Sequence, residues 1–191
     1  MAIPTSELQK INPSAVIELF ELQLIAAIHG SDQLYRFHSG SNQNNRGEII
    51  WQGNSYTRFP IEAEGFEFTG RGQIPRPTLT VSNVLSTLTT LIASVNAFTP
   101  ANDLNGAKLT RIRTTADNID AANFDGNTNP FGTPSSNKYP DEVFFLDRKV
   151  TENREIVQYE MRGENDHANV KVPKRQITRK DFDGVGTFID A

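Results

Sequence analysis

Short runs of alternating polar and apolar residues, separated by turn-forming residues, constrain the fold of this chain most. The clearest pair is Ile49–Gln52 and Ser55–Phe59, which are joined by the turn residues Gly53 and Asn54. Two β-prone runs with a two-residue connection are typical of a β-hairpin. Further short runs have the same character: Leu34–Phe37, Phe66–Thr69, Thr78–Ser82, Lys108–Thr115, Val143–Val150 and Ile156–Met161. The pattern predicts a mainly β fold, an antiparallel β-barrel or sandwich.

The alternation that places apolar residues on one face of a strand is clearest in three segments. Alternation predicts one shared face for each strand of the last pair: Phe144, Leu146 and Val150 on the first, and Val157, Tyr159 and Met161 on the second. In Ala15–Ile28, Phe20, Leu22 and Leu24 alternate with polar residues, which favours a strand. A helical alternative, in which Val16, Leu19, Phe20 and Leu24 share a face, stays open for this segment.

Two helices are expected. A capping-box pattern at Ser6–Gln9 predicts a short N-terminal helix, ended by Asn12 and Pro13. A longer helix is predicted over about 84–95, after the cap candidates Ser82 and Asn83. Its apolar face consists of Val84, Leu85, Leu88, Leu91, Ile92 and Val95. The opposite face carries Ser and Thr, which suits contact with a neighbouring chain or packing under a loop equally well.

The chain divides into a β-rich region, residues 1–164, and an extended basic tail, residues 165–191. The β-rich region contains the helical insertion at about 83–98 and a long loop, residues 117–141, rich in Asn, Asp, Gly and Pro. A loop of that length is usually functional or mobile.

Composition excludes several classes of function. The absence of cysteine excludes disulfides, thiolate nucleophiles and Cys-ligated metal centres. A net charge of −4 argues against a protein that wraps nucleic acid. Leu22–Ile28, the longest apolar stretch, is too short to span a bilayer, and no signal peptide opens the sequence, so a cytoplasmic product is expected.

No catalytic set is recognisable. His29, His38 and His167 fall in polar turns at unrelated positions and are expected at the surface. No Gly-x-Ser-x-Gly elbow occurs, and Gly70-Arg71-Gly72 lacks the lysine and helix of a phosphate loop. An enzyme is therefore a rival hypothesis without support in the residues.

Two charged segments are candidate binding sites. Asp117, Asp120, Asp125 and Asn127 supply oxygen ligands for calcium, but their spacing does not match a calcium loop and turn chemistry explains them. The tail residues Lys171, Lys174, Arg175, Arg179 and Lys180 lack interleaved aromatics for nucleic acid. For the tail we favour docking on an acidic neighbour.

An ordered set of short motifs resembles the phage minor tail protein L family. The set includes Trp51-Gln52-Gly53, Arg76–Asn83, Asn123–Asn127, Pro140–Val143, Leu146–Lys149, Thr151–Val157 and Val170–Ile177. The resemblance covers roughly residues 15 to 180. It implies a structural, non-enzymatic hub subunit with a β-barrel domain at the distal tail tip of long-tailed, non-contractile (lambda-like) phages, made in the host cytoplasm.

The resemblance also implies partners. They are the ring-forming distal tail protein, the central receptor-binding fibre protein and further copies of the chain around the tail axis, three in all, with the tape measure protein as a further candidate. No membrane and no sequence-specific nucleic acid are expected. Longer members add a cysteine-rich domain that holds an iron–sulfur cluster; this chain has no cysteine and is expected to hold no cofactor, whether it is a short form or a truncated one.

Candidate interface residues come from the helix, the long loop and the tail. They are Val84, Leu88, Leu91, Phe124, Asp125, Phe131, Tyr139, Lys171, Lys174, Arg175, Arg179 and Lys180. The main rival function is a β-barrel module that recognises carbohydrate or a receptor through Trp51, Tyr56 and Phe59. That reading requires these aromatic side chains to be exposed on one face.

Overall fold

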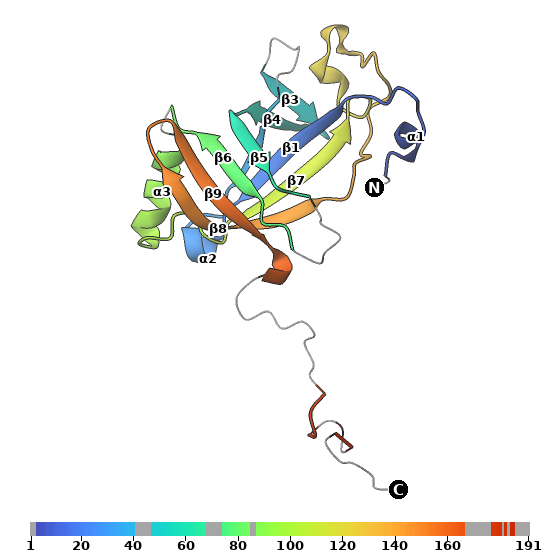
Figure 1. Cartoon of the computed structure of the whole chain (residues 1–191). Helices are drawn as coiled ribbons and strands as arrows, with labels where there is room; N and C mark the ends of the chain where they lie inside the picture. Colours follow the sequence, from blue (N-terminus) through green and yellow to red (C-terminus); the bar gives the residue numbers. More distant parts are fainter. Residues whose placement is uncertain are drawn as a thin grey trace, which may run out of the picture.

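A computed structural model describes residues 3–40, 47–67, 74–84, 87–166, 177–180, 182 and 184–185. Over these residues nine strands form one sheet in the order β3-β4-β2-β1-β7-β8-β9-β6-β5 (Figure 1). The strands are β1 (Val16–Gln23), β2 (Leu34–His38), β3 (Glu48–Trp51), β4 (Asn54–Arg58), β5 (Ile61–Glu64), β6 (Thr78–Ser82), β7 (Lys108–Thr115), β8 (Glu142–Glu152) and β9 (Ile156–Gly163). The helices are α1 (Thr5–Leu8), α2 (Ala26–His29) and α3 (Thr87–Phe98), with single 3₁₀ turns η1 (Ala121–Asn123), η2 (Asp125–Asn127) and η3 (Glu164–Asp166).

The predicted mainly β class is confirmed, but the sheet is open rather than closed into a barrel. Its two edges, β3 and β5, are not paired with each other within the described chain. The sheet is also mixed, because β2 and β4 run parallel, with Phe37 opposite Thr57. Parallel pairing follows from the hairpin: β3 reverses the chain once, and β4 reverses it again beside β2.

The predicted hairpin is present with its turn shifted by one residue. Trp51 pairs with Asn54, so the connection is Gln52-Gly53 rather than Gly53-Asn54. Both turn residues have positive φ, 51° and 72°, as a type I′ turn requires. Gln52 adopts a positive-φ conformation that sequence propensities favour for Asn or Gly. The sequence therefore placed the turn one residue too late.

Most strand predictions are confirmed, including β6 and β7 to the residue, but two details are wrong. The strand expected at Phe66–Thr69 is not formed at Phe66 and Glu67, and residues 68–69 lie outside the described residues. The observed strand here is β5, and the Phe66 ring packs edge-on against Phe144, with 5.3 Å between centroids. Val150 was expected to share a face with Phe144 and Leu146. It is 52% exposed, because the β8–β9 register shifts between Lys149 and Thr151.

Helix predictions are right in kind and shifted in position. The long helix is α3, which begins at Thr87 and continues to Phe98 rather than covering 84–95. Val84 lies outside it and is 73% exposed. At the N-terminus α1 begins after Pro4, and Ser6 lies inside the helix instead of capping it. The helix α2 was not predicted.

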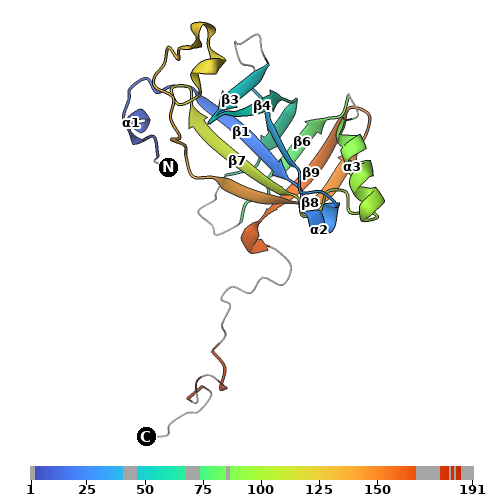
Figure 2. The same cartoon turned by 180° about the vertical axis from the view of Figure 1, so that it is seen from behind.

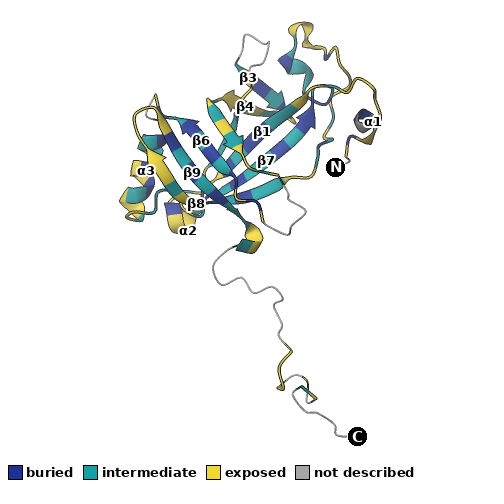
Figure 3. Ribbon diagram, in the orientation of Figure 1, coloured by how far each residue is buried: buried dark blue, intermediate teal, exposed yellow. Residues whose placement is uncertain are grey.

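Both faces of the sheet are buried around β1, which settles its conformation as a strand. Phe20, Leu22 and Leu24 face a core that includes α3, β6 and β9, as the alternation predicted. Leu19 faces the opposite way, into a second core made with the β3–β4 hairpin. Burial on both faces weakens the alternation that a one-sided strand shows, which is why a helical spacing also fitted. Figure 3 shows buried positions along the central strands and exposed ones at the β8–β9 tip.

Candidate functional site

The free edge of β5 borders an apolar groove of about 750 Å³. The groove runs between β2 and β4 on one side and β5 and β6 on the other, with α3 at one end. Figure 2 shows α3 beside the ends of β6 and β9. The apolar lining of the groove includes Tyr35, Phe37, Phe59, Ile61, Val81 and Leu91.

The two sheet edges differ in how their backbone groups are satisfied. At β3, the Asn123 side chain accepts a hydrogen bond from the Ile50 amide at 2.7 Å and donates one to the Ile50 carbonyl at 2.6 Å. The side-chain amide of Asn123 therefore makes the hydrogen bonds that a neighbouring strand would make, and it covers the β3 edge. At β5, Ile61 and Ala63 have no such cover among the described residues.

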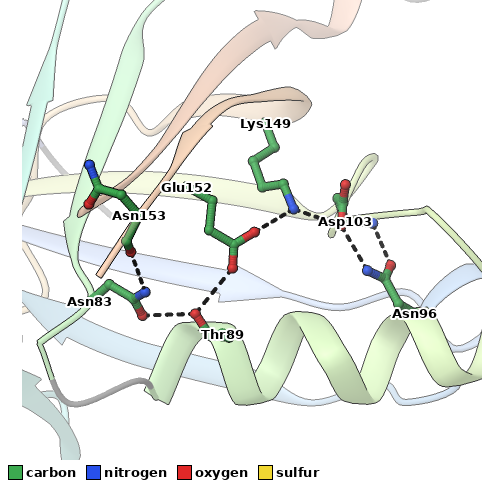
Figure 4. A network of polar contacts seen from close by, with 7 residues as sticks. All are labelled: Asn83, Thr89, Asn96, Asp103, Lys149, Glu152 and Asn153. Carbon is green, nitrogen blue, oxygen red and sulfur yellow. Dashed lines mark hydrogen bonds and ion pairs between the residues drawn. The ribbon is translucent and has the colours of Figure 1, made fainter. Parts of the chain in front are cut away.

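A network of hydrogen bonds and ion pairs connects α3, which lines one end of the groove, to the β8–β9 hairpin (Figure 4). Asn83 Nδ2 donates to the Asn153 carbonyl at 2.8 Å. The Thr89 hydroxyl lies 3.0 Å from Asn83 Oδ1 and 3.2 Å from Glu152 Oε1, and its single proton serves one acceptor at a time. Lys149 bridges to Glu152 at 2.6 Å.

The same lysine extends the network to the loop after α3. Lys149 Nζ lies 3.0 Å from Asp103, which also accepts a hydrogen bond from Asn96 at 2.7 Å. The hydrogen bonds from Asn96 and Lys149 hold the pKa of Asp103 below its usual value. Burial alone would lower the pKa of Lys149, but its bonds to Glu152 and Asp103 raise it. The network therefore stays charged at neutral pH and fixes α3.

The long loop 117–141 is anchored rather than loose. Asp120 accepts hydrogen bonds from the backbone amides of Gln52 at 3.1 Å and Gly53 at 2.8 Å, so it binds the hairpin turn. The buried Asn129 side chain donates to several loop carbonyls, including that of Ile119 at 3.1 Å. A second groove, of about 710 Å³, lies between this loop and β1.

The acidic loop residues do not converge on a metal site. Asp117 accepts from the Thr115 hydroxyl, Asp120 binds the hairpin turn and Asp125 is exposed. Within the described ranges, no three or more His, Cys, Asp or Glu side chains gather as metal ligands do. Turn and anchoring chemistry, the alternative that the sequence favoured, accounts for these carboxylates.

The expectation of surface histidines is wrong for the two that the structure describes. His29 is 3% exposed: its Nδ1 accepts the Ile25 amide at 2.9 Å, and its Nε2 donates to the Asn105 carbonyl at 3.1 Å. His38 is completely buried, and burial lowers its pKa. Both side chains contact backbone carbonyls outside their own segments, those of Asn105 and Gly47, and alternation and turn signals do not reveal such contacts. His167 lies outside the described residues, as does Gly70-Arg71-Gly72.

The aromatic side chains of the rival carbohydrate site are not exposed. Trp51 and Tyr56 are buried in the second core, where the Tyr56 hydroxyl donates to Glu21 at 2.9 Å. Phe59 is half-buried in the first core, with its ring centroid 6.3 Å from that of Phe37. These three residues stabilise the fold and offer no stacking platform.

The interface candidates are dispersed over the described surface. Val84 is exposed, Leu91 is half-buried against the core and Leu88 is buried within it. Among the loop candidates Phe131 is 61% exposed and lies edge-on to Phe124, with 5.8 Å between centroids.

Tyr139 is half-buried, with the Arg113 guanidinium 5.6 Å from its ring centroid. Of the tail candidates Arg179 and Lys180 are exposed, whereas Lys171, Lys174 and Arg175 lie outside the described residues. The structure therefore brings Phe124 and Phe131 together and leaves the helix candidates apart from them.

The free edge of β5 and the covering role of Asn123 were missed from the sequence. The β5 run Ile61–Glu64 does alternate apolar and acidic residues, which is the signal that would have found the strand. No local signal shows that an asparagine in a loop pairs with a strand far away in the sequence.

Comparison with known proteins gives concordant results. The family described as phage minor tail protein L matches residues 27–183. Tail tip protein L of Escherichia phage lambda is 33% identical over 130 residues, which are 68% of this chain and 51% of that protein. The chain thus spans about half the length of the curated relative it matches.

The matched region contains β2 to β9, the α3 helix and the anchored loop. In the part of the chain that the structure describes, no helix has both the length and the apolar character to cross a membrane. The extent of the family match, over most of the folded region, shows that this chain belongs to the phage minor tail protein L family, a family of structural phage tail proteins.

Proposed function

We propose that this chain is a hub subunit of the phage tail tip that links the distal tail ring to the central receptor-binding fibre protein. The observation that carries the proposal is the 33% identity to tail tip protein L over 130 residues, together with the family match over residues 27–183, which include β2 to β9. In this role the chain acts by packing against other subunits and performs no catalytic step. It resides at the tip of the virion's tail after synthesis in the host cytoplasm.

We further propose that copies of the chain, three in all, surround the tail axis and line the DNA passage. A net charge of −4 supports this placement, because a lumen that passes DNA without binding it must not neutralise phosphates. The open sheet supports it too, since a free edge and an apolar groove are surfaces that a neighbouring subunit can cover.

Co-assembly tests the proposal. The full chain is produced together with the ring-forming distal tail protein and the central fibre protein of the same phage, and the mixture is separated by size. We expect one complex that contains all three proteins and several copies of this chain. A chain that elutes alone while the other two assemble would contradict the hub role.

A pair of variants tests the loop as a contact surface. Phe131→Asp places a charge on the exposed tip of the 117–141 loop, and Val150→Asp does the same on the β8–β9 hairpin, where exposure is similar at 52%. We expect incorporation of the Phe131→Asp chain into the three-protein complex to fall at least tenfold. Incorporation of the Val150→Asp chain should equal that of the unchanged chain. Equal incorporation of the two variants would show that the 117–141 loop is not a contact surface.

A further inference from the structure

The backbone pattern of β5 leaves one side of this strand unpaired. Pro60 accepts a hydrogen bond from the Ser82 amide at 2.9 Å, so residues 60, 62 and 64 face β6 in the antiparallel ladder. Alternation then directs the N–H and C=O groups of Ile61 and Ala63 away from β6. No other described backbone group pairs with them.

The opposite wall of the groove, formed by β2 and β4, is mostly paired. The Leu24 amide donates to the Gln33 carbonyl at 3.0 Å, and the register then directs the backbone groups of Leu34 and Arg36 away from β1. β2 is an inner strand, and its parallel ladder with β4 at Phe37 and His38 also takes up the Arg36 carbonyl, so β2 offers few free backbone groups among the described residues. An apolar groove bordered along one wall by the unpaired edge of β5 is the geometry that an added strand fills.

Side chains along β5 specify the chemistry of that strand. Ile61 and Ala63 pack against the first core, and Ile61 lines the groove, whereas Glu62 and Glu64 are exposed on the other face. Because residues opposite each other in a ladder share a face, an added strand must alternate apolar residues toward the groove with basic residues beside the glutamates. Tyr159 also lines the groove, and its buried hydroxyl has no hydrogen-bond partner among the described residues.

The chain carries such a pattern in its own sequence. Val170-Lys171-Val172 alternates apolar and basic residues, and Pro173 ends the run because it has no amide to donate. This segment lies outside the described residues. Two valines would face the groove while Lys171 lies beside Glu62 and Glu64.

We propose that the free edge of β5 takes up the Val170–Val172 run of a second copy as an added strand, with Lys174 following it as a further basic residue. Each copy then gives a strand and receives one, which is a heterologous contact that closes into a ring when repeated around an axis. This inference deepens the proposed ring of copies and rests on it, but the contact itself is tested on the isolated chain.

The first experiment measures peptide binding. A fluorescent peptide with the sequence of residues 166–180 is titrated with the full chain in which Val170→Asp and Val172→Asp remove competition from its own segment. We expect saturable binding that Ala63→Pro weakens roughly tenfold, because proline removes an edge amide without disturbing the β6 ladder. The control Ala63→Val keeps the amide and should bind as the unchanged edge does.

A charge swap provides a second arm that does not depend on proline being tolerated. Glu62→Lys with Glu64→Lys should abolish binding of the native peptide, and a peptide carrying Lys171→Glu and Lys174→Glu should restore it. Absence of saturable binding, unchanged binding to Ala63→Pro, or failure of the swapped pair to recover would each overturn the proposal.

Sedimentation of the unchanged full chain tests whether the added strand comes from a second copy or from the same chain. We expect self-association that rises with concentration and is lost in Ala63→Pro. A chain that stays monomeric at all concentrations would mean that the segment docks on its own copy, which overturns the assignment to a second copy. The co-assembly result with tail proteins is independent of this outcome, so failure of the strand exchange is distinguishable from failure of the hub role.

Discussion

Replacing Asn123 with alanine tests whether a loop side chain holds the outer edge of the sheet. The side chain of this residue is 5% exposed and makes three strong hydrogen bonds: to the Ile50 amide at 2.7 Å, the Ile50 carbonyl at 2.6 Å and the Asp120 carbonyl at 2.7 Å. Alanine leaves all three backbone groups without this partner. It also frees the loop from β3.

The magnitude follows from those bonds. Each contributes about 1 kcal/mol net, so the variant should lose about 2–4 kcal/mol of unfolding free energy. That is a large fraction of the roughly 5–15 kcal/mol available to a domain of this kind. Asn123→Asp should be at least as destabilising, because aspartate keeps the acceptor for Ile50 but places a carboxylate beside two carbonyl oxygens.

Urea unfolding followed by tryptophan fluorescence measures the effect. Trp51, the single tryptophan, lies beside Ile50 in β3 and is buried, so its emission reports on this edge. Asn105→Ala is the matched control, because Asn105 is exposed and its hydrogen bonds to other described residues come from its backbone amide and carbonyl, which alanine keeps. An Asn123→Ala midpoint equal to that of the control would refute the argument.

Three further predictions concern other parts of the fold. Tyr159→Phe should leave the urea midpoint unchanged or raise it, because the buried hydroxyl has no hydrogen-bond partner and its burial costs about 1–3 kcal/mol; a clear drop would contradict this. Gln52→Asn should raise the unfolding free energy by about 1 kcal/mol or less, measured in the same way, because asparagine tolerates the positive φ of the turn better. The hydrogen bond from Lys10 lowers the pKa of Glu7 to about 2, below its ordinary 4.5, so the docking of α1 should persist above pH 4.5 and be lost as the pH falls toward 2. Hydrogen exchange at the Ser14 amide, which donates to Glu7, reports this loss, and Glu7→Gln should abolish the pH dependence.

Local sequence patterns predicted the strands well where one face is buried and one is not. In β9, Val157, Tyr159 and Met161 are all buried, as their alternation indicated. The β7 bounds were predicted to the residue because turn residues flank that run on both sides. These successes depend only on neighbours in sequence.

Errors arose where distant contacts outweigh local preference. Val150 is turned outward by a register shift that depends on the pairing partner, and alternation within one strand cannot show it. His29 and His38 were expected at the surface because they neighbour turn residues. The structure buries them against backbone carbonyls of Asn105 and Gly47.

The sequence by itself determined the fold class, the order of most strands and the family, because hydrophobic alternation, turn residues and ordered motifs are local properties. The tertiary structure decided which edges of the sheet are covered and which are free. Asn123 lies 73 residues from Ile50 along the chain, and the groove is formed by strands from both ends of the sheet. Closure of a barrel depends on how the whole sheet curls and on which backbone groups find partners, and those quantities exist only once the chain has folded.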